Sequence, residues 1–249
     1  MSDYDVIVVV SDLRPFSEDE AWLRWYGVPL VLLRDSHMRD GIAAQVWLVL
    51  YEDSTKIDYT ICPVVYLEEA LAAPQLDEGL DVGYRVLVDK DGLTGALKPP
   101  TYTAHIPRKP SEGEYLALVE EFWWETTYVA KNLWRDELFP AKYSFEAVIK
   151  FDLLRRMLEW YVEIDHNWSL KPGTLGRGLK TLLAPDIWSD VERTFVGADI
   201  EENWEALFRT AALFRGIASA VASRLGYAYP QDLDRRVMRY LSDLRDREQ

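Results

Sequence analysis

Cysteine is almost absent from this chain of 249 residues, and long hydrophobic runs are absent altogether. The single cysteine, Cys62, has no second cysteine with which to form an internal disulfide. No apolar run approaches the roughly 20 residues that a membrane-spanning helix needs. The first apolar run follows acidic residues and contains no small-residue cleavage site, so a secretory signal is not expected. These absences predict a reduced, cytoplasmic protein that does not enter a membrane.

Positive charge is also scarce. The chain holds 28 Lys and Arg against 42 Asp and Glu, which gives a formal net charge of −14. Residues 1–106 account for 8 basic and 18 acidic residues, and residues 107–249 for 20 and 24. Such a balance disfavours binding to nucleic acid phosphates and favours a cationic small molecule or metal ions as partners. The alternative is that the acidity only keeps the protein soluble.

The motifs that most often reveal an active site are missing as well. The sequence contains neither a Walker-type loop nor a G-x-G-x-x-G loop. Its three histidines, His37, His105 and His166, show no metal-ligand spacing, and they form no Ser/His/Asp arrangement that the sequence supports. Any chemistry must therefore be sought among the carboxylates.

The first part of the chain shows mainly strand patterns. Aromatic residues make up 13% of the sequence, as expected for a well-packed globular protein. Ser17 and Glu20 stand at capping-box spacing ahead of an apolar run that Gly27 ends, which predicts a helix. An irregular polar stretch is expected at 34–44, and a hairpin turn at 52–55. The expected strands are 6–10, 29–33, 46–51, 56–62 and 85–88, and the expected helices are 18–26 and 66–72.

The second part is helical. Ser111 and Glu114 form another possible capping box, and apolar residues then recur near the 3.6-residue period. Residues 98–110 carry four of the twelve prolines and no helical period, so they are expected to connect two domains. The prediction is an α+β protein with a small mixed β-sheet domain at 1–106 and an all-helical bundle at 107–249. The later helices are expected at 145–165, 186–194, 201–225 and 231–245.

Three aspartates are the strongest candidates for chemistry. Asp3 and Asp5 precede the apolar run Val6–Val10 and share one face of a strand, because strand side chains alternate. Asp58 lies between Ile57 and Tyr59, where a strand disfavours Asp unless it has a partner. If the two strands are neighbours, the carboxylates can converge on one or two Mg²⁺ ions, as two-metal phosphoryl chemistry requires. The alternative is that they are solvated acids.

Two pairs of glutamates are the second candidate. Glu121 and Glu125 are four residues apart, as are Glu159 and Glu163, so each pair shares a helix face and repels unless a cation neutralises it. If both faces line one cleft, they form an acidic pocket for a cationic ligand. Lys131 could reach toward phosphates. The alternative for all five residues is a solvated helix surface.

Several segments resemble the aminoglycoside 6-adenylyltransferases, the streptomycin adenylyltransferase family within the polymerase-β-like nucleotidyltransferases. The resemblance covers nearly the whole chain, and the long Phe-Trp-Trp segment is its most specific part. It rests on Asp3-Tyr4-Asp5, Lys56-Ile57-Asp58-Tyr59-Thr60, 88–92, 121–135, 157–161, 203–208 and 213–215.

The resemblance implies a nucleotidyltransferase domain followed by a helical substrate-binding domain. It implies that Asp3 and Asp5 hold Mg²⁺, that Asp58 is a metal ligand or the base, and that AMP passes from ATP to the 6-hydroxyl of a streptomycin-like aminoglycoside. In one respect the sequence departs from the family pattern, because the Gly-Ser turn that grips the triphosphate is missing upstream of Asp3. This departure leads us to expect an N-terminally truncated first domain, and the alternative is a protein that has lost its triphosphate-binding turn.

Three functional hypotheses follow. The first is an aminoglycoside adenylyltransferase that confers antibiotic resistance, uses Mg²⁺ and ATP, and acts as a monomer or weak oligomer. The second is a non-catalytic aminoglycoside-binding protein, and the third is a nucleotidyltransferase with a different acceptor. Neither nucleic acid nor a membrane is an expected partner.

Overall fold

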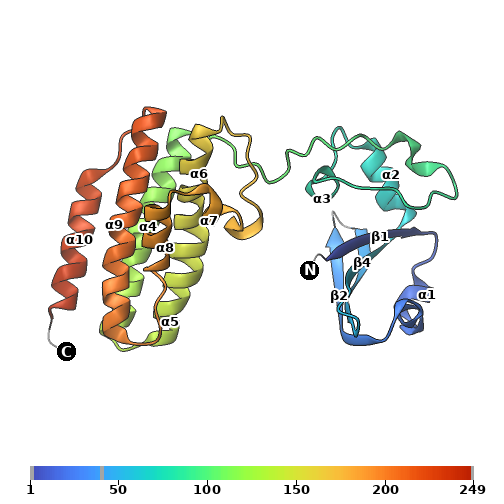
Figure 1. The fold of residues 1–249 in the computed structure, drawn as a ribbon, viewed down its shortest axis with the longest axis horizontal. Coiled ribbons are helices and arrows are strands. Elements are labelled where there is room, and N and C mark those ends of the chain that lie inside the picture. The colour runs from blue at the N-terminus through green and yellow to red at the C-terminus, as the bar shows by residue number, and fades with distance from the viewer. Residues whose placement is uncertain (1–2, 40–41, 248–249) are drawn as a thin grey trace. The chain divides into compact units, whose positions relative to one another are not determined.

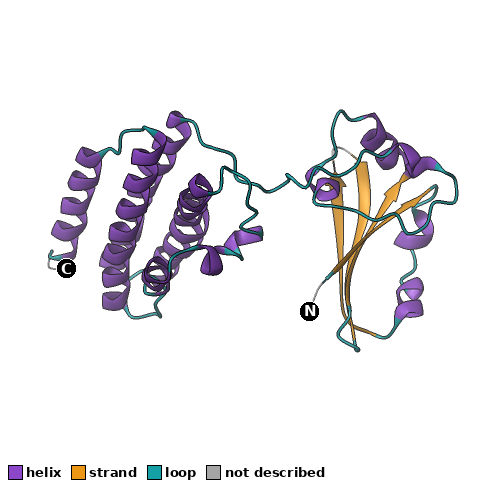
Figure 2. Cartoon of the chain, turned by 45° about the horizontal axis from the view of Figure 1, so that its top comes forward, coloured by secondary structure: helices purple, strands orange, loops and turns teal. Residues whose placement is uncertain are grey.

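A computed structural model describes residues 3–39 and 42–247 of the chain. The chain divides into two compact units, residues 1–104 and 105–249 (Figure 1). The first unit contains the strands and short helices, and the second is helical throughout its regular elements (Figure 2). The prediction of a mixed sheet followed by a helical region is thus confirmed. Among the described residues, none of the helices is both long enough and apolar enough to cross a membrane.

The first unit is built on a mixed sheet with the strand order β1-β4-β3-β2. Strand β1 pairs with β4 in parallel, whereas β4 with β3 and β3 with β2 are antiparallel pairs. The parallel pair brings the start of the chain beside a strand more than fifty residues away. The strands are β1 (Tyr4–Val10), β2 (Pro29–Arg39), β3 (Ile42–Tyr51) and β4 (Lys56–Pro63).

One face of this sheet is a closed hydrophobic core. Trp47, Val49 and Tyr59 are buried there against Trp22 and Leu23. The last two come from the 3₁₀-helix η1 (Ala21–Tyr26), which follows the short helix α1 (Arg14–Ser17). The opposite face carries the acidic residues of β1 and β4, because strand side chains alternate between the two faces.

Three sequence predictions for this unit were wrong in detail. Ser17 ends α1 instead of capping a longer helix, and its hydroxyl donates to the carbonyl of Arg14. Of the stretch predicted as irregular, residues 34–39 belong to β2 and residues 42–44 to β3, and residues 40–41 lie outside the described residues. The cross-strand pairing at Arg34 and Trp47 is accompanied by a contact of the Arg34 guanidinium with the Trp47 ring, 4.9 Å from its centre. Residues 85–88, predicted as a strand, lie outside the sheet.

The last residues of the first unit, 101–104, are held in place by the carboxylate of Asp81. Asp81 is only 8% exposed and accepts hydrogen bonds from the backbone N–H groups of Thr101, Thr103 and Ala104. The bond from Thr101 N is 2.6 Å long. These bonds tie the last residues of the unit to α3. The remaining short elements are α2 (Val64–Ala72), α3 (Glu78–Asp81) and the 3₁₀-helix η2 (Leu93–Ala96).

The second unit begins with the capping box predicted from the sequence. Ser111 accepts from the backbone of Glu114, and the Glu114 carboxylate accepts from the backbone of Ser111 at 2.8 Å, which fixes the start of α4. Gly226 ends α9 at a φ of 78°, where glycine avoids the strain of a side chain. The helices are α4 (Glu112–Trp134), α5 (Leu138–Lys142), η3 (Tyr143–Leu154), α6 (Arg155–Asp165), η4 (Thr174–Gly176), α7 (Leu179–Leu182), α8 (Pro185–Glu192), α9 (Ile200–Leu225) and α10 (Gln231–Arg245).

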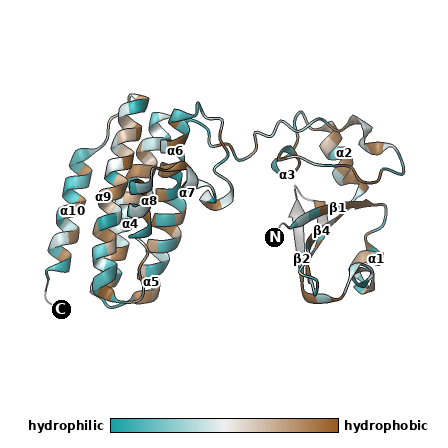
Figure 3. Ribbon diagram, in the orientation of Figure 1, coloured by the Kyte–Doolittle hydropathy of each residue, from teal (hydrophilic) through white to brown (hydrophobic). Residues whose placement is uncertain are grey.

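The long helices of this unit enclose one large hydrophobic core. Each carries a hydrophobic and a hydrophilic side (Figure 3), and Phe122 of α4 stacks on Phe214 of α9 with ring centres 3.5 Å apart. Helix η3 is a π-helix, so the single helix predicted at 145–165 changes its winding at Arg155. Lys150 of η3 is buried and donates to Glu146 and to the Thr194 carbonyl. Burial lowers the pKa of Lys150 to about 8.

Candidate functional site

Two of the predicted aspartates are cross-strand neighbours. In the parallel pairing of β1 with β4, Asp5 stands directly opposite Asp58. Side chains at paired positions project to the same face of a sheet, so both carboxylates lie on the face opposite the hydrophobic core. Lys56, two residues before Asp58 on β4, also lies on this face. The condition that the sequence set for a shared site, that the strands of Asp5 and Asp58 are neighbours, is therefore met.

Lys56 joins the third aspartate to the group. Its ammonium Nζ lies 2.8 Å from Asp3 Oδ2 and 3.6 Å from Asp58 Oδ2. The hydrogen bond to Asp3 raises the pKa of Lys56, so the side chain is a cation at neutral pH. Sequence reasoning assigned no role to Lys56, although its place two residues before Asp58 puts both on one strand face. We call Asp3, Asp5, Asp58 and Lys56 the acidic strand site.

Asp58 is the least exposed acid of this site. Its side chain is 23% exposed, whereas that of Asp3 is 49% exposed. The Oδ1 atom of Asp58 is buried and has no hydrogen-bond partner. A buried carboxylate oxygen without a partner is costly, and a cation or a donor on a ligand would relieve that cost.

The donor chemistry of the acidic strand site fits a hard divalent cation such as Mg²⁺, which prefers carboxylate oxygens. The carboxylates do not form a preorganised metal site. Among the described residues, no group of three or more His, Cys, Asp or Glu side chains is close enough together to hold a metal ion. Lys56 supplies positive charge between Asp3 and Asp58 instead. A metal would thus meet the facing carboxylates of Asp5 and Asp58, with the carboxylate of Asp3 beside them bonded to Lys56.

The first glutamate pair lies on the outer surface of α4. Glu121 is exposed, and burial together with the charge of Glu121 raises the pKa of Glu125. Between them Trp124 is 61% exposed, and its ring meets that of Tyr128 edge to face at 6.0 Å. We call Glu121, Trp124, Glu125 and Tyr128 the acidic aromatic patch. The Lys131 ammonium lies 4.5 Å from the centre of the Tyr128 ring.

The second glutamate pair is engaged within α6. Glu159 is buried, and its carboxylate accepts from Arg155 Nη1 at 2.6 Å. Glu163 is fully buried, and its Oε2 accepts from the backbone N–H of Leu170 at 3.2 Å. Burial raises the pKa of both carboxyls. Both therefore have local partners, and Glu159 also lines a cavity.

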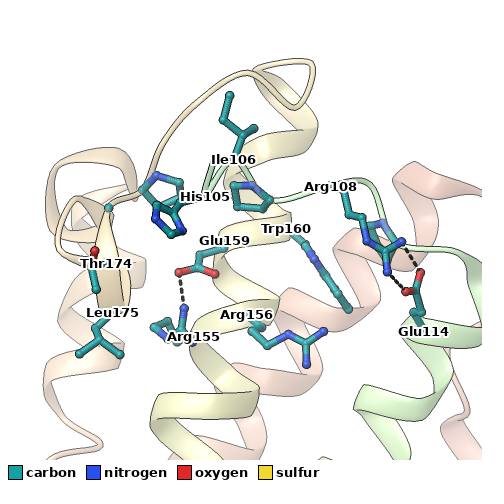
Figure 4. A pocket seen from close by; sticks show the side chains of 14 residues that line it. His105, Ile106, Arg108, Glu114, Arg155, Arg156, Glu159, Trp160, Thr174 and Leu175 are labelled. Carbon is teal, nitrogen blue, oxygen red and sulfur yellow. Dashed lines mark hydrogen bonds and ion pairs between the residues drawn. The ribbon is translucent and has the colours of Figure 1, made fainter. Parts of the chain in front are cut away.

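That cavity is formed entirely by residues of the second unit, and it is rich in arginine (Figure 4). Its volume is about 370 Å³. Sequence reasoning missed it, because its residues come from the start of the unit, from α4 and α6, and from the segment that leads into η4. The charged and aromatic residues that line it are His105, Arg108, Glu114, Arg155, Arg156, Glu159 and Trp160.

Residues 1–244 match the streptomycin adenylyltransferase family. The chain belongs to this family. It is 28% identical over 243 residues to an aminoglycoside 6-adenylyltransferase of Bacillus subtilis strain 168, covering 96% of this chain and 82% of that protein. A Campylobacter jejuni protein of the same name is 29% identical over 231 residues, covering 92% and 77%. The crystal structure of an aminoglycoside 6-adenyltransferase from Bacillus subtilis matches with a TM-score of 0.55 at 26% identity, over 98% of this chain and 89% of that one.

Membership of the streptomycin adenylyltransferase family confirms the resemblance seen in the sequence. It identifies the protein as a transferase enzyme that uses a nucleotide. The match spans both units, so the acidic strand site and the helical unit both fall within the family region.

Proposed function

We propose that this protein transfers AMP from ATP to a hydroxyl group of a streptomycin-like aminoglycoside in a Mg²⁺-dependent reaction. The observation that carries the proposal is the direct pairing of Asp5 with Asp58, whose Oδ1 is buried without a partner. The family supplies the reaction class. The names of the relatives favour the 6-position of the acceptor.

Each residue of the acidic strand site has a proposed role. Asp3, Asp5 and Asp58 would hold the metal, and bound Mg²⁺ would neutralise phosphate charge and lower the barrier to attack. Asp58 is also placed to accept the proton of the attacking hydroxyl, because one of its oxygens is free of hydrogen bonds. The acceptor oxygen then bonds to the α-phosphorus, the bond from that phosphorus to the β-phosphate oxygen breaks, and pyrophosphate leaves.

The acidic aromatic patch suits the acceptor. An aminoglycoside carries several positive charges, and Glu121 and Glu125 form a like-charge pair that a cation stabilises. The exposed rings of Trp124 and Tyr128 offer flat surfaces for sugar rings and for cationic groups. Of the four glutamates, these two are the better candidates, because Glu159 pairs with Arg155 and Glu163 is buried.

The test is a transfer assay with ATP, Mg²⁺ and streptomycin, followed by pyrophosphate release and by mass spectrometry of the drug. The wild type is expected to yield adenylylated streptomycin, and Asp5→Asn to yield none. Asp35→Asn is the matched control, because Asp35 is an exposed aspartate on the same sheet face but on the far strand β2. A wild type that adenylylates none of a panel of aminoglycosides would refute the proposed acceptor class.

The patch is tested separately by kinetics. Glu121→Gln combined with Glu125→Gln should raise the KM for streptomycin about tenfold, because two charge-assisted contacts are lost. The kcat should change little, since neither residue belongs to the acidic strand site. A double variant with an unchanged KM would show that the acceptor binds elsewhere.

A further inference from the structure

The arginine-rich cavity of the second unit has the opposite charge to the rest of the chain. Three arginines, Arg108, Arg155 and Arg156, line it against two glutamates, Glu114 and Glu159. Counted over its arginines and glutamates, the lining therefore carries one net positive charge in a chain whose formal net charge is −14. A cavity with positive charge inside an acidic protein attracts an anion, not a cationic antibiotic.

The arginines of this cavity are not equally engaged. Arg108 pairs with Glu114, and Arg155 pairs with Glu159 at 2.6 Å (Figure 4). Arg156 forms no ion pair with a carboxylate of the described chain. Its guanidinium lies 5.5 Å from the centre of the Trp160 ring, a contact that leaves its N–H groups open to a ligand.

The two existing ion pairs narrow the class of anion. Arg155 is already held by Glu159 and by the carbonyl of Phe151 at 2.7 Å. A simple carboxylate offers one charge and can compensate Arg156 alone. A condensed phosphate chain offers several charges and many acceptor oxygens, so it can bind Arg156 and the remaining donors of Arg155 and Arg108 together.

We propose that this cavity is a binding site for a condensed phosphate chain, with Arg156 as its principal anchor. A volume of about 370 Å³ fits such a ligand, since small-molecule sites begin at about 300 Å³. The source of the chain is either free pyrophosphate or the phosphate tail of a nucleotide. The proposal does not depend on the aminoglycoside acceptor or on the acidic strand site.

The carboxylate of Glu159 opposes the binding of an anion in this cavity. Its carboxylate occupies Arg155 and lies in the same cavity, so it repels an incoming anion. Burial raises the pKa of this carboxyl, but the pairing with Arg155 favours its ionised form. Glu159→Gln removes that charge and leaves an amide of nearly the same shape. A condensed phosphate should therefore bind more tightly to this variant, a gain that a purely structural role would not produce.

The test is calorimetry of the full chain with inorganic pyrophosphate and with tripolyphosphate, in EDTA so that no metal joins the ligand to the carboxylates. Arg156→Gln should weaken binding about tenfold, the equivalent of one charge-assisted hydrogen bond. Glu159→Gln should strengthen binding severalfold. Arg193→Gln is the matched control, since Arg193 is an exposed arginine at the end of α8 that does not line the cavity. It should bind as the wild type does.

Three results would overturn the proposal. They are a wild type that binds neither phosphate, an Arg156→Gln variant with unchanged affinity, and citrate binding as tightly as tripolyphosphate. ATP and ADP, titrated into the wild type and into Arg156→Gln, identify the source: binding that is tighter than that of tripolyphosphate and that Arg156→Gln weakens points to a nucleotide, and equal binding points to the free phosphate chain. Because neither streptomycin nor metal is present, failure here leaves the transfer reaction untouched, and failure of transfer leaves this site untouched.

Discussion

Asp5 and Asp58 stand opposite each other on the parallel strands β1 and β4. This pairing turns a local Asp-x-Asp pattern into a site shared by two strands. Asp5→Asn should abolish Mg²⁺ binding, measured by calorimetry. The free energy of unfolding in urea should stay the same or rise, because the substitution removes one of two facing anions. Asp35→Asn should keep both properties, and a large loss of stability in Asp5→Asn would instead assign Asp5 a structural role.

Lys56 competes with a metal for the same carboxylates. Its Nζ lies 2.8 Å from Asp3 and 3.6 Å from Asp58, so a divalent cation must displace it or share the oxygens. Lys56→Met should tighten Mn²⁺ binding about two- to fivefold, in line with the modest strength of exposed ion pairs. Lys90→Met, in an exposed turn, is the control. Weaker Mn²⁺ binding by Lys56→Met would show that the lysine orients the acids for the metal.

Asp81 fixes the end of the first unit. Its carboxylate accepts from Thr101 N at 2.6 Å, Thr103 N at 3.0 Å and Ala104 N at 2.9 Å, and these bonds lower its pKa. Asp81→Asn replaces one acceptor oxygen by a donor, so hydrogen exchange at residues 101–104 should become faster. Asp91→Asn, an exposed aspartate in a turn, should leave that exchange as it is in the wild type. Unchanged exchange in Asp81→Asn would mean that other contacts hold the segment.

The capping box of α4 predicts a pH dependence of stability. Hydrogen bonds from Ser111 and from Arg108 lower the pKa of Glu114 to about 2. A Glu in the unfolded chain has a pKa of about 4.3. The contribution of ionised Glu114 to the free energy of unfolding is therefore complete above that pH and is lost as the pH falls through about 2. The difference in unfolding free energy between the wild type and Glu114→Gln should therefore shrink below about pH 4. Glu112→Gln, in the same helical turn, should show no such convergence, and a pH-independent difference for Glu114→Gln would contradict this reading.

Local signals in the sequence were sufficient for much of the helical unit. The capping box of Ser111 and Glu114 and the helix-ending Gly226 are signals that involve only a few neighbouring residues. The start of α4 and the end of α9 therefore follow from the sequence. Strand lengths were harder to predict, because the polar half of β2 is defined by its pairing with β3, for example at Arg34 opposite Trp47. The β-propensities of single residues give no information about which strands pair.

The candidate site shows the same division. The strand periodicity placed Asp3 and Asp5 together and set Asp58 on the polar face of its strand, and the pairing of β1 with β4 brings Asp5 opposite Asp58. The part played by Lys56 depends on the register of β1 against β4, and the arginine-rich cavity depends on segments about fifty residues apart. Neither arrangement has a signal at fixed spacing in the sequence.

The most direct test of the central claim is mass spectrometry of streptomycin after incubation with the protein, ATP and Mg²⁺. Wild type and Asp35→Asn should convert the drug to its AMP adduct with matching release of pyrophosphate, and Asp5→Asn should convert none. An adduct formed equally well by Asp5→Asn would contradict the assignment of the chemistry to the paired aspartates of β1 and β4.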